Sequence, residues 1–436
     1  MSETVTECAE CHLRSILESQ FRVGFTRAGK RARLCPVCWR RDQASNARIR
    51  AYWIFGVGVL GFFLPDSPLR WFILGVTSGY FLAQLLTPLH EAAHALAAYV
   101  LGFHLNQFKI GWWSEPVVWL RWGRCTVELC GLVEGGMVLA TTKNMRWFRV
   151  RQILITAAGP GLHLVLVVIA VAVRYRAPLG SWIEWIATIV FLTNGFELVH
   201  NLYPRTVASP DGPVRNDGML ILNWCFAKPE DLRQQRLAYI YHECLYLLHI
   251  GRYDDGMQLA KTGRAEFPDD PNMESLEAFC WSSSGSRDEA KARYQALRYR
   301  EDLPPEADAA ILSFLIYLDL MEDDPEQLKE ALEYSERAYS MLPWDSMIKG
   351  PRGAALVASG QVDAGLNLLQ QAFHQCFEPE SRAFHAAFIA WGKHQQGDSV
   401  GAHRYLEMAK RLEPRADSIE RVEGILNEKA ATSVVG

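Results

Sequence analysis

Residues 71–94 read WFILGVTSGYFLAQLLTPLHEAAH and carry two signals in one continuous segment. From Trp71 to Leu89 there is no Asp, Glu, Lys or Arg, which is typical of a helix that crosses a membrane. The segment ends in HEAAH, and on a helix His90 and His94 project from one face and can bind one zinc ion. Glu91 beside them can accept a proton from water. Because ionisable groups are costly in hydrocarbon and are usually retained there for function, the stretch predicts a metallohydrolase site inside a membrane helix.

The length of the chain, 436 residues, favours two or three units rather than one compact domain. A net charge of -4 gives no general case for nucleic acid as a partner. Residues 21–50 contain nine Lys or Arg and one acid, Asp42, which is typical of the cytosolic flank of a membrane span. Ten irregularly spaced cysteines indicate a reducing compartment, and no signal peptide is expected at the amino terminus.

Two Cys-x-x-Cys pairs stand within the first fifty residues. They are Cys8 with Cys11 and Cys35 with Cys38, separated by a segment that can form a short hairpin. Four thiolates suit tetrahedral structural zinc, which would fold a segment too small to be stable by burial alone. The pattern predicts a zinc ribbon over residues 1–46, with a redox dithiol or unrelated thiols as the alternative and His12 as a bystander.

Four apolar segments predict a helix bundle in the membrane. Their ranges are 51–65, which is short for a span, then 70–102, 152–173 and 183–203. Asn194, Glu197 and Asn201 recur at three- and four-residue steps in the last segment, so this polar face should point into the bundle. Four spans place both termini in the cytoplasm, in agreement with the basic residues between the second and third spans.

The segment 111–140 is rich in Trp, Val and Gly and does not resemble another span. Residues 127–129 and 137–139 predict short strands around Gly131 and Gly135-Gly136. An edge strand near a protease site can hold a substrate in extended form, and an interfacial aromatic anchor is the alternative.

A series of turn prolines marks the last two hundred residues. Pro268, Pro304, Pro343, Pro379 and Pro414 follow one another at intervals of 36, 39, 36 and 35 residues. The period and the amphipathic helices between the prolines resemble degenerate tetratricopeptide repeats over 228–430. Such an array offers a concave face to protein or peptide partners, and a merely rigidifying solenoid is the alternative.

Two aspartates are candidates for a third zinc ligand. Asp217 precedes an apolar run and is the preferred candidate, whereas Asp211 is followed by Gly212 and Pro213, a combination that fits a turn. The choice between them stays open at this point.

Residues 70–225 resemble the site-2 protease family of intramembrane zinc metalloproteases. The resemblance rests on the HEAAH helix, the glycine-containing segment 131–136, Ala158-Gly159-Pro160, and Asn201 with Pro204 followed by Asp217-Gly218. Two features depart from the family pattern. His163 stands where the family often has Asn, and the interval from Pro204 to Asp217 is longer than in many members.

The resemblance implies that His90, His94 and Asp217 bind a catalytic zinc and that Glu91 is the general base. It also implies that Asn201 orients the substrate or the developing oxyanion. The substrate would be a single-span membrane protein, cleaved within its transmembrane segment after local unwinding of its helix.

These patterns together predict a mainly α protein: an amino-terminal zinc ribbon, a polytopic membrane bundle with a small β-hairpin region over 47–227, and a carboxyl-terminal α-solenoid. We expect a zinc endopeptidase in the lipid bilayer of a bacterial inner membrane, with a plastid membrane as the alternative location. A membrane-anchored adaptor without peptidase activity is the alternative function. A zinc enzyme with a non-peptide substrate is a third, weaker hypothesis.

Overall fold

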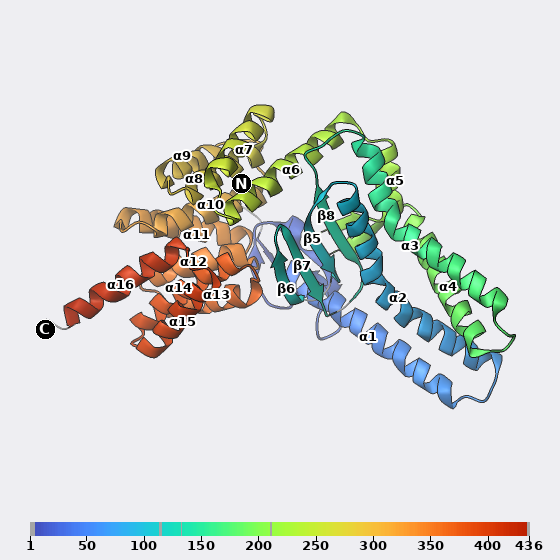
Figure 1. Cartoon of the computed structure of the whole chain (residues 1–436). Coiled ribbons are helices and arrows are strands. Elements are labelled where there is room, and N and C mark those ends of the chain that lie inside the picture. The colour runs from blue at the N-terminus through green and yellow to red at the C-terminus, as the bar shows by residue number, and fades with distance from the viewer. Residues whose placement is uncertain (1–4, 113–115, 132, 210–211, 434–436) are drawn as a thin grey trace. The chain divides into compact units, whose positions relative to one another are not determined.

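The computed structural model of the chain describes residues 5–112, 116–131, 133–209 and 212–433 (Figure 1). The chain divides into two compact units, one of Met1–Trp39 with Leu247–Gly436 and one of Arg40–Tyr246. The amino-terminal segment therefore belongs to the same unit as the repeats. The divisions at 39/40 and 246/247 fall inside helices, whereas the boundaries predicted from the sequence lie at 46/47 and 227/228.

Long helices dominate the unit Arg40–Tyr246. Helices α2 (Pro68–Val100), α3 (Phe148–Arg176) and α4 (Trp182–Leu202) are each long and apolar enough to cross a membrane. Serine caps begin two of them, since Ser67 accepts a hydrogen bond from the backbone N–H of Arg70 and Ser181 accepts one from that of Glu184. The second, third and fourth predicted segments therefore lie in helices of the expected length.

The first predicted segment, 51–65, lies in α1 (Pro36–Phe63), which is not among these three helices. Its amino-terminal half is basic, and the apolar stretch that follows is shorter than the roughly 20 residues needed for a span. α1 packs closely on α2, because a Cβ at Gly58 would meet Thr77 and one at Gly61 would meet Ile73. A short apolar helix is thus paired with a long one.

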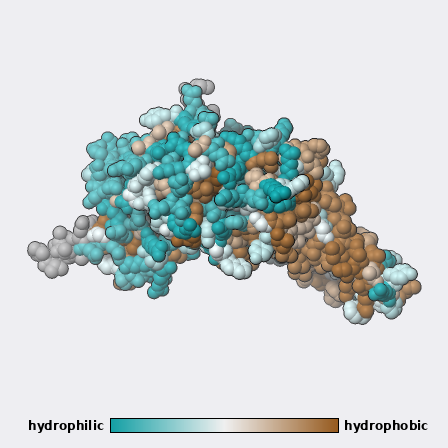
Figure 2. Space-filling model, turned by 45° about the horizontal axis from the view of Figure 1, so that its top comes forward, coloured by the Kyte–Doolittle hydropathy of each residue, from teal (hydrophilic) through white to brown (hydrophobic). Residues whose placement is uncertain are grey.

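The surface of α1 to α4 is apolar. Large side chains such as Phe62, Leu85, Val168 and Phe196 are more than half exposed on these helices. In Figure 2 the hydrophobic surface gathers over this helical part of the unit. Water does not favour so large an exposed apolar patch, whereas lipid chains do.

A four-stranded sheet follows α2. Its strands are β5 (His104–Ile110), β6 (Pro116–Trp122), β7 (Cys125–Cys130) and β8 (Gly136–Thr141), in the order β6-β7-β5-β8. The two predicted strands are present as β7 and β8, and the expected small β region is present as this sheet, in which β6 and β7 form an antiparallel hairpin. β7 and β8 do not pair with each other; they flank β5, which is parallel to β7 and antiparallel to β8.

A short connection leads from α4 back toward the bundle. It consists of the hairpin of β9 (Thr206–Ser209) and β10 (Gly212–Arg215) and leads to α5 (Asp217–Cys225). Helix α6 (Pro229–His249) follows α5. The buried Asn216 caps α5, because its side chain accepts a hydrogen bond from the backbone N–H of Met219. α5 packs against α3.

The amino-terminal segment forms two small hairpins. These pair β1 (Thr6–Glu7) with β2 (Arg14–Ser15) and β3 (Arg22–Phe25) with β4 (Arg31–Leu34), and the short 3-10 helix η1 (Glu18–Gln20) lies between them. The turn of the second hairpin contains Gly29 at φ 73°, a conformation that favours glycine. The predicted hairpin between the two cysteine pairs is confirmed.

The repeats form an array of antiparallel helix pairs. After α6 the helices are α7 (Tyr253–Glu266), α8 (Pro271–Ser283), α9 (Arg287–Leu297), α10 (Pro305–Leu320), α11 (Pro325–Met341), α12 (Ser346–Ala358), α13 (Val362–Gln375), α14 (Pro379–Gln395), α15 (Ser399–Leu412) and α16 (Asp417–Ser433). α8, α10, α12 and α14 each pack on the helix that follows. This is the tetratricopeptide-like arrangement expected from the proline period.

Glycines and helix caps set the repeat geometry. Gly251, Gly285, Gly360 and Gly397 have positive φ and follow the first helix in four of the pairs. Aspartate caps such as Asp324, which accepts a hydrogen bond from the backbone N–H of Glu326, begin several of the helices. Each helix pair is therefore a unit with defined ends, and it buries its apolar face against the neighbouring pairs.

Candidate metal centres

The histidines of the HEAAH segment meet Asp217 inside the unit Arg40–Tyr246. Nε2 of His90 lies 3.0 Å from Oδ2 of Asp217 and 3.1 Å from Nε2 of His94. Nε2 of His94 lies 3.4 Å from Oδ1 of Asp217. Both histidines are buried, and Asp217 reaches them from the first turn of α5. The structure thus brings together three side chains of the two types, imidazole and carboxylate, that zinc binds in proteins.

The spacing of these three groups fits a tetrahedral ion. Bonds of roughly 2.0–2.1 Å to nitrogen and oxygen place neighbouring ligand atoms about 3.3 Å apart. The distances of 3.0 to 3.4 Å among the three side chains lie close to this value. Two histidines and one carboxylate leave a fourth position for water or substrate, which is the composition of a catalytic rather than a structural zinc site.

Gly159, from the Ala-Gly-Pro stretch in α3, lines this cluster. A Cβ at Gly159 would lie 2.4 Å from Nε2 of His94 and 2.5 Å from Nε2 of His90. Any side chain would therefore occupy the space in front of the two ligand nitrogens. A point 2.4 and 2.5 Å from the two nitrogens is close to the roughly 2.0–2.1 Å of a zinc–nitrogen bond, so the space that a Cβ would fill is where a bound ion would lie.

The ring of His94 is held through its other nitrogen. Nδ1 of His94 lies 2.7 Å from the backbone carbonyl oxygen of Ile155, one turn before Gly159 in α3. A carbonyl only accepts hydrogen bonds, so Nδ1 carries the proton and Nε2 presents its lone pair to the centre. This is the orientation that a zinc ligand requires.

Glu91 is buried beside the first strand residue of β8. A Cβ at Gly136 would lie 2.5 Å from Cγ and 2.8 Å from Cδ of Glu91. The backbone of β8 therefore packs directly on the Glu91 side chain. Glycine at position 136 has a structural reason, because a larger residue there would displace the predicted base.

Asn216 fixes the start of α5 to the end of α4. Its Nδ2 donates to the backbone carbonyls of His200, Asn201 and Tyr203 at 3.2, 3.1 and 2.8 Å. Gly218 allows this close approach, since a Cβ there would lie 2.1 Å from the carbonyl oxygen of Leu202. The neighbour Asp217 is consequently aimed at the histidines by groups on both sides of it.

His163 belongs to the site, although the sequence pattern alone predicts no role for it. Its Nε2 lies 3.1 Å from Nδ1 of His90, and its Nδ1 lies 2.8 Å from Oδ1 of Asn194. Asn194 was expected to face the bundle, and it does so with no exposed surface. The sequence did contain a signal for His163, because a histidine in an apolar helix needs a polar partner when it is buried.

One sequence candidate, Asn201, is not part of this cluster. Asn201 lies one residue before the end of α4, and its backbone carbonyl accepts the hydrogen bond from Asn216. The described side chains His90, His94, His163 and Asp217 form the cluster without it. Asp211, the alternative third ligand, lies outside the described residues.

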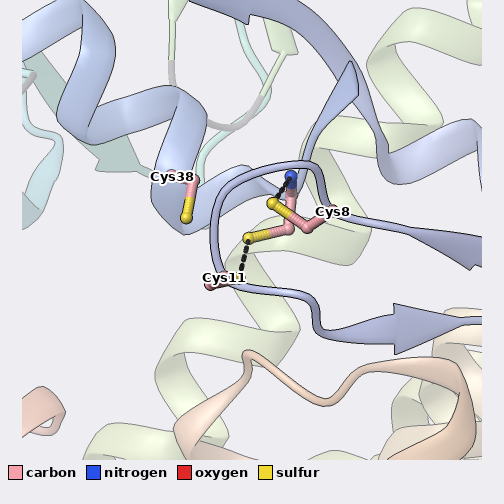
Figure 3. Close-up of side chains that lie close together, drawn as sticks. Cys8, Cys11 and Cys38 are labelled. Carbon is pink, nitrogen blue, oxygen red and sulfur yellow. Dashed lines mark hydrogen bonds between the residues drawn. The ribbon is translucent and has the colours of Figure 1, made fainter. Parts of the chain in front are cut away.

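The four predicted ribbon cysteines form a second cluster, in the unit Met1–Trp39 with Leu247–Gly436. Their sulfur atoms all lie within 4.8 Å of one another, and Sγ of Cys11 is 3.7 Å from that of Cys35. Tetrahedral bonds of about 2.3 Å to zinc place sulfurs about 3.8 Å apart. Figure 3 shows Cys8 and Cys11 in the loop and Cys38 on the facing helix. The group can bind a metal ion.

Crowding changes the acidity of these thiols. Hydrogen bonding from Cys38 lowers the pKa of Cys35 to about 5, whereas burial raises the pKa of Cys11 to about 11. The Cys35 thiolate therefore forms readily, whereas the raised pKa values of Cys11 and Cys38 make these two thiols resist ionisation without a nearby cation. A divalent metal would remove this conflict by neutralising the added charge.

The ribbon packs on the edge of the repeats. The backbone N–H of Ile16 donates to the carbonyl of Ser340 at 3.1 Å, and the hydroxyl of Ser15 donates to that of Met341. The ring of Phe21 meets Trp344 edge to face at 5.6 Å. The loop between α11 and α12 is thus covered by the segment between the two cysteine pairs.

Comparisons with known proteins show no family. No family model and no curated protein matches the chain. Among solved structures, TTC0263, a thermophilic TPR protein in Thermus thermophilus, covers 44% of this chain and 98% of its own at TM-score 0.35 and 20% identity. MamA MSR-1 C2 covers 41% and 98% at TM-score 0.28 and 14% identity. YrrB, a TPR protein with an unusual peptide-binding site, covers 42% and 90% at TM-score 0.27 and 14% identity. The helix pairs themselves carry the repeat assignment.

Proposed function

We propose that this chain is a zinc-dependent intramembrane endopeptidase that cleaves transmembrane segments of other membrane proteins. One observation carries the proposal: His90, His94 and Asp217 converge within helices of apolar surface, and Glu91 is adjacent in the chain. The resemblance of residues 70–225 to site-2 proteases supports the same chemistry. Glu91 is present beside the ligands, so the chain has both the metal ligands and the general base that a zinc hydrolase requires.

A bound zinc ion would supply a Lewis acid that polarises the substrate carbonyl and acidifies water. His90, His94 and Asp217 would hold the ion. Glu91 would accept the proton of the attacking water at a carboxylate oxygen and return it to the nitrogen of the departing amine. The burial of Glu91 against Gly136 keeps its carboxylate in place and limits the access of bulk water.

The proposed metal site lies near one end of α2, where the water needed for hydrolysis can reach it. His94 lies roughly 9 Å along the helix axis from Val100, where α2 ends. The site is thus close to one end of the apolar helix rather than at its centre. We place this end on the cytoplasmic side, with the short apolar stretch of α1 as a fourth span that returns the amino terminus to the same side.

The free edge of β8 suggests how a substrate would bind. Within the described sheet β8 pairs only with β5, and its first residue, Gly136, contacts Glu91. An unwound substrate segment could pair with the open edge and present a carbonyl to the centre. Glycine, proline or polar residues in a substrate span would lower the cost of unwinding. A single-span protein is therefore the preferred substrate class.

The repeats and the ribbon would select or regulate substrates by binding protein or peptide partners. Within α14, residues 383–392 are buried without interruption, so this inner helix presents no open face. Ion pairs also link parts of the array that are far apart in the sequence. Arg287 pairs with Asp417 at 2.8 Å, and Arg421 pairs with Asp323 at 2.8 Å. Partners would accordingly bind the outer surface or the loops.

A membrane-anchored adaptor is the second candidate. The ribbon and repeats form a compact unit of their own, which favours a binding role independent of peptidase activity. Glu91→Gln separates the two functions, because it removes the base and leaves all three ligands. An adaptor would work unchanged with this substitution.

The test compares membrane proteomes of cells that carry the wild type, Glu91→Gln or the control Glu184→Gln, which changes an acid in the first turn of α4. We expect a few single-span proteins to accumulate uncut in Glu91→Gln alone. Equal proteomes in all three strains, with zinc bound and protein expressed, would contradict the peptidase and favour the adaptor.

A further inference from the structure

We propose that His163 and Asn194 form a hydrogen-bond relay that sets the tautomer of His90 and so prepares it as a metal ligand. The inference rests on the metal site of the proposed function. It concerns two positioning residues, on α3 and α4, that support a ligand on α2.

The direction of the relay follows from its far end. Nδ2 of Asn194 lies 2.8 Å from the backbone carbonyl oxygen of Val190 and donates to it. The opposite orientation of the amide would place two acceptor oxygens at that distance, which is repulsive. Oδ1 of Asn194 therefore faces His163 and can only accept a hydrogen bond.

The next two hydrogen bonds inherit this direction. Nδ1 of His163 lies 2.8 Å from the Asn194 oxygen, so Nδ1 carries the proton. In the neutral ring Nε2 of His163 then has a free lone pair, which accepts from Nδ1–H of His90 at 3.1 Å. The proton of His90 is held on Nδ1, and its Nε2 is left with the lone pair that faces Asp217 and His94.

Burial makes this arrangement exclusive. His163 and Asn194 are 2% and 0% exposed, so water does not offer competing partners. The relay thereby gives His90 what the Ile155 carbonyl gives His94, a fixed proton on Nδ1. Loss of such an outer partner weakens metal binding by about 10–100-fold in other zinc sites.

Two substitutions separate hydrogen bonding from packing. His163→Leu fills the space but cannot accept the His90 proton. His163→Gln offers a carbonyl oxygen to His90 and an amide donor to Asn194, so it preserves the direction of the relay. We expect zinc affinity at this site to fall about 10–100-fold in His163→Leu and to recover largely in His163→Gln.

The experiment measures zinc retained per chain by the full-length protein in detergent against increasing chelator, with Glu91→Gln present throughout to prevent self-cleavage. The ribbon zinc is identified by its loss in Cys35→Ser and should be equal in all His163 variants. Wild-type affinity in His163→Leu, or no recovery in His163→Gln, would overturn the relay and leave the metal site standing. A chain whose only zinc disappears with Cys35→Ser would instead overturn the metal site and the proposed function together.

Discussion

Gly159 faces His94 so closely that a Cβ added to the glycine would lie 2.4 Å from the Nε2 atom of the histidine. That nitrogen is the one proposed to bind zinc, and helical backbone cannot shift easily by the ångström that a methyl group requires. We expect Gly159→Ala to lose most of the zinc of the membrane centre. The measurement is zinc content per chain after purification.

Gly161 is a matched control for this substitution. It lies in the same helix, and apart from the adjoining backbone of that helix no atom comes within 4 Å of a Cβ built on it. Gly161→Ala should retain zinc, and the higher helix propensity of alanine should if anything favour α3. Equal zinc loss in both variants would mean that the effect is general to glycine in α3 and not specific to the ligands.

The sequence was sufficient for the local part of this site. His90 and His94 are four residues apart, and their common face follows from helix geometry alone. Asp217 is remote in sequence, and the preference for it over Asp211 rests on the apolar run after Asp217 and on the turn-like Gly212-Pro213 after Asp211. The structure adds the ligand distances and the Asn216 clamp, which depend on how α4 and α5 pack.

Other elements needed three-dimensional information. His163 and Asn194 stand on different helices, and no spacing in the sequence relates one to the other. Strands β5 and β7 are parallel neighbours in the sheet, although β6 lies between them in the sequence. Neither a hairpin turn nor an alternating pattern of residues therefore predicts their pairing. Gly136 and Gly159 can be identified in the sequence, but the sequence does not show why they are glycines. The structure shows that a Cβ at either position would collide with Glu91 or with the two histidines.

Gly136→Ala should affect the base rather than the metal. A Cβ at position 136 would lie 2.5 Å from Cγ of Glu91, and the three atoms nearest to it all belong to Glu91. We expect cleavage to fall at least tenfold while zinc content is unchanged, the same signature as Glu91→Gln. Loss of zinc together with activity would show that β8 supports the ligands instead.

The two candidate aspartates can be ranked by the same zinc measurement. Asp217→Ala removes an oxygen that lies 3.0 Å from Nε2 of His90, so zinc should be lost from the membrane centre. Asp211→Ala should keep it. If Asp211→Ala caused the larger loss, the third ligand would be reassigned to that residue.

Metal removal from the ribbon should loosen the repeats locally. Cys35→Ser breaks the four-thiol cluster, and the adjacent segment holds the loop between α11 and α12 through Ile16 and Phe21. We expect faster hydrogen exchange over residues 340–349, with the membrane zinc retained. Cys225→Ser changes an exposed cysteine outside the cluster and should leave exchange unchanged. Unaltered exchange in Cys35→Ser would show that the ribbon docks without its metal.

The stability of the repeat array should depend on one buried histidine. Burial and the charge of Arg382 lower the pKa of His385 to about 3 from an ordinary value of 6.5. Between these values the unfolded chain binds a proton that the folded array does not, so acid favours unfolding. From this residue we expect a loss of up to about 1.4 kcal/mol per pH unit as pH falls below 6.5. The check is the urea midpoint of the full chain, read by circular dichroism from pH 7.5 to 4.5. His385→Gln should flatten the dependence and His394→Gln on the same helix should not, whereas equal slopes in wild type and His385→Gln would refute the assignment.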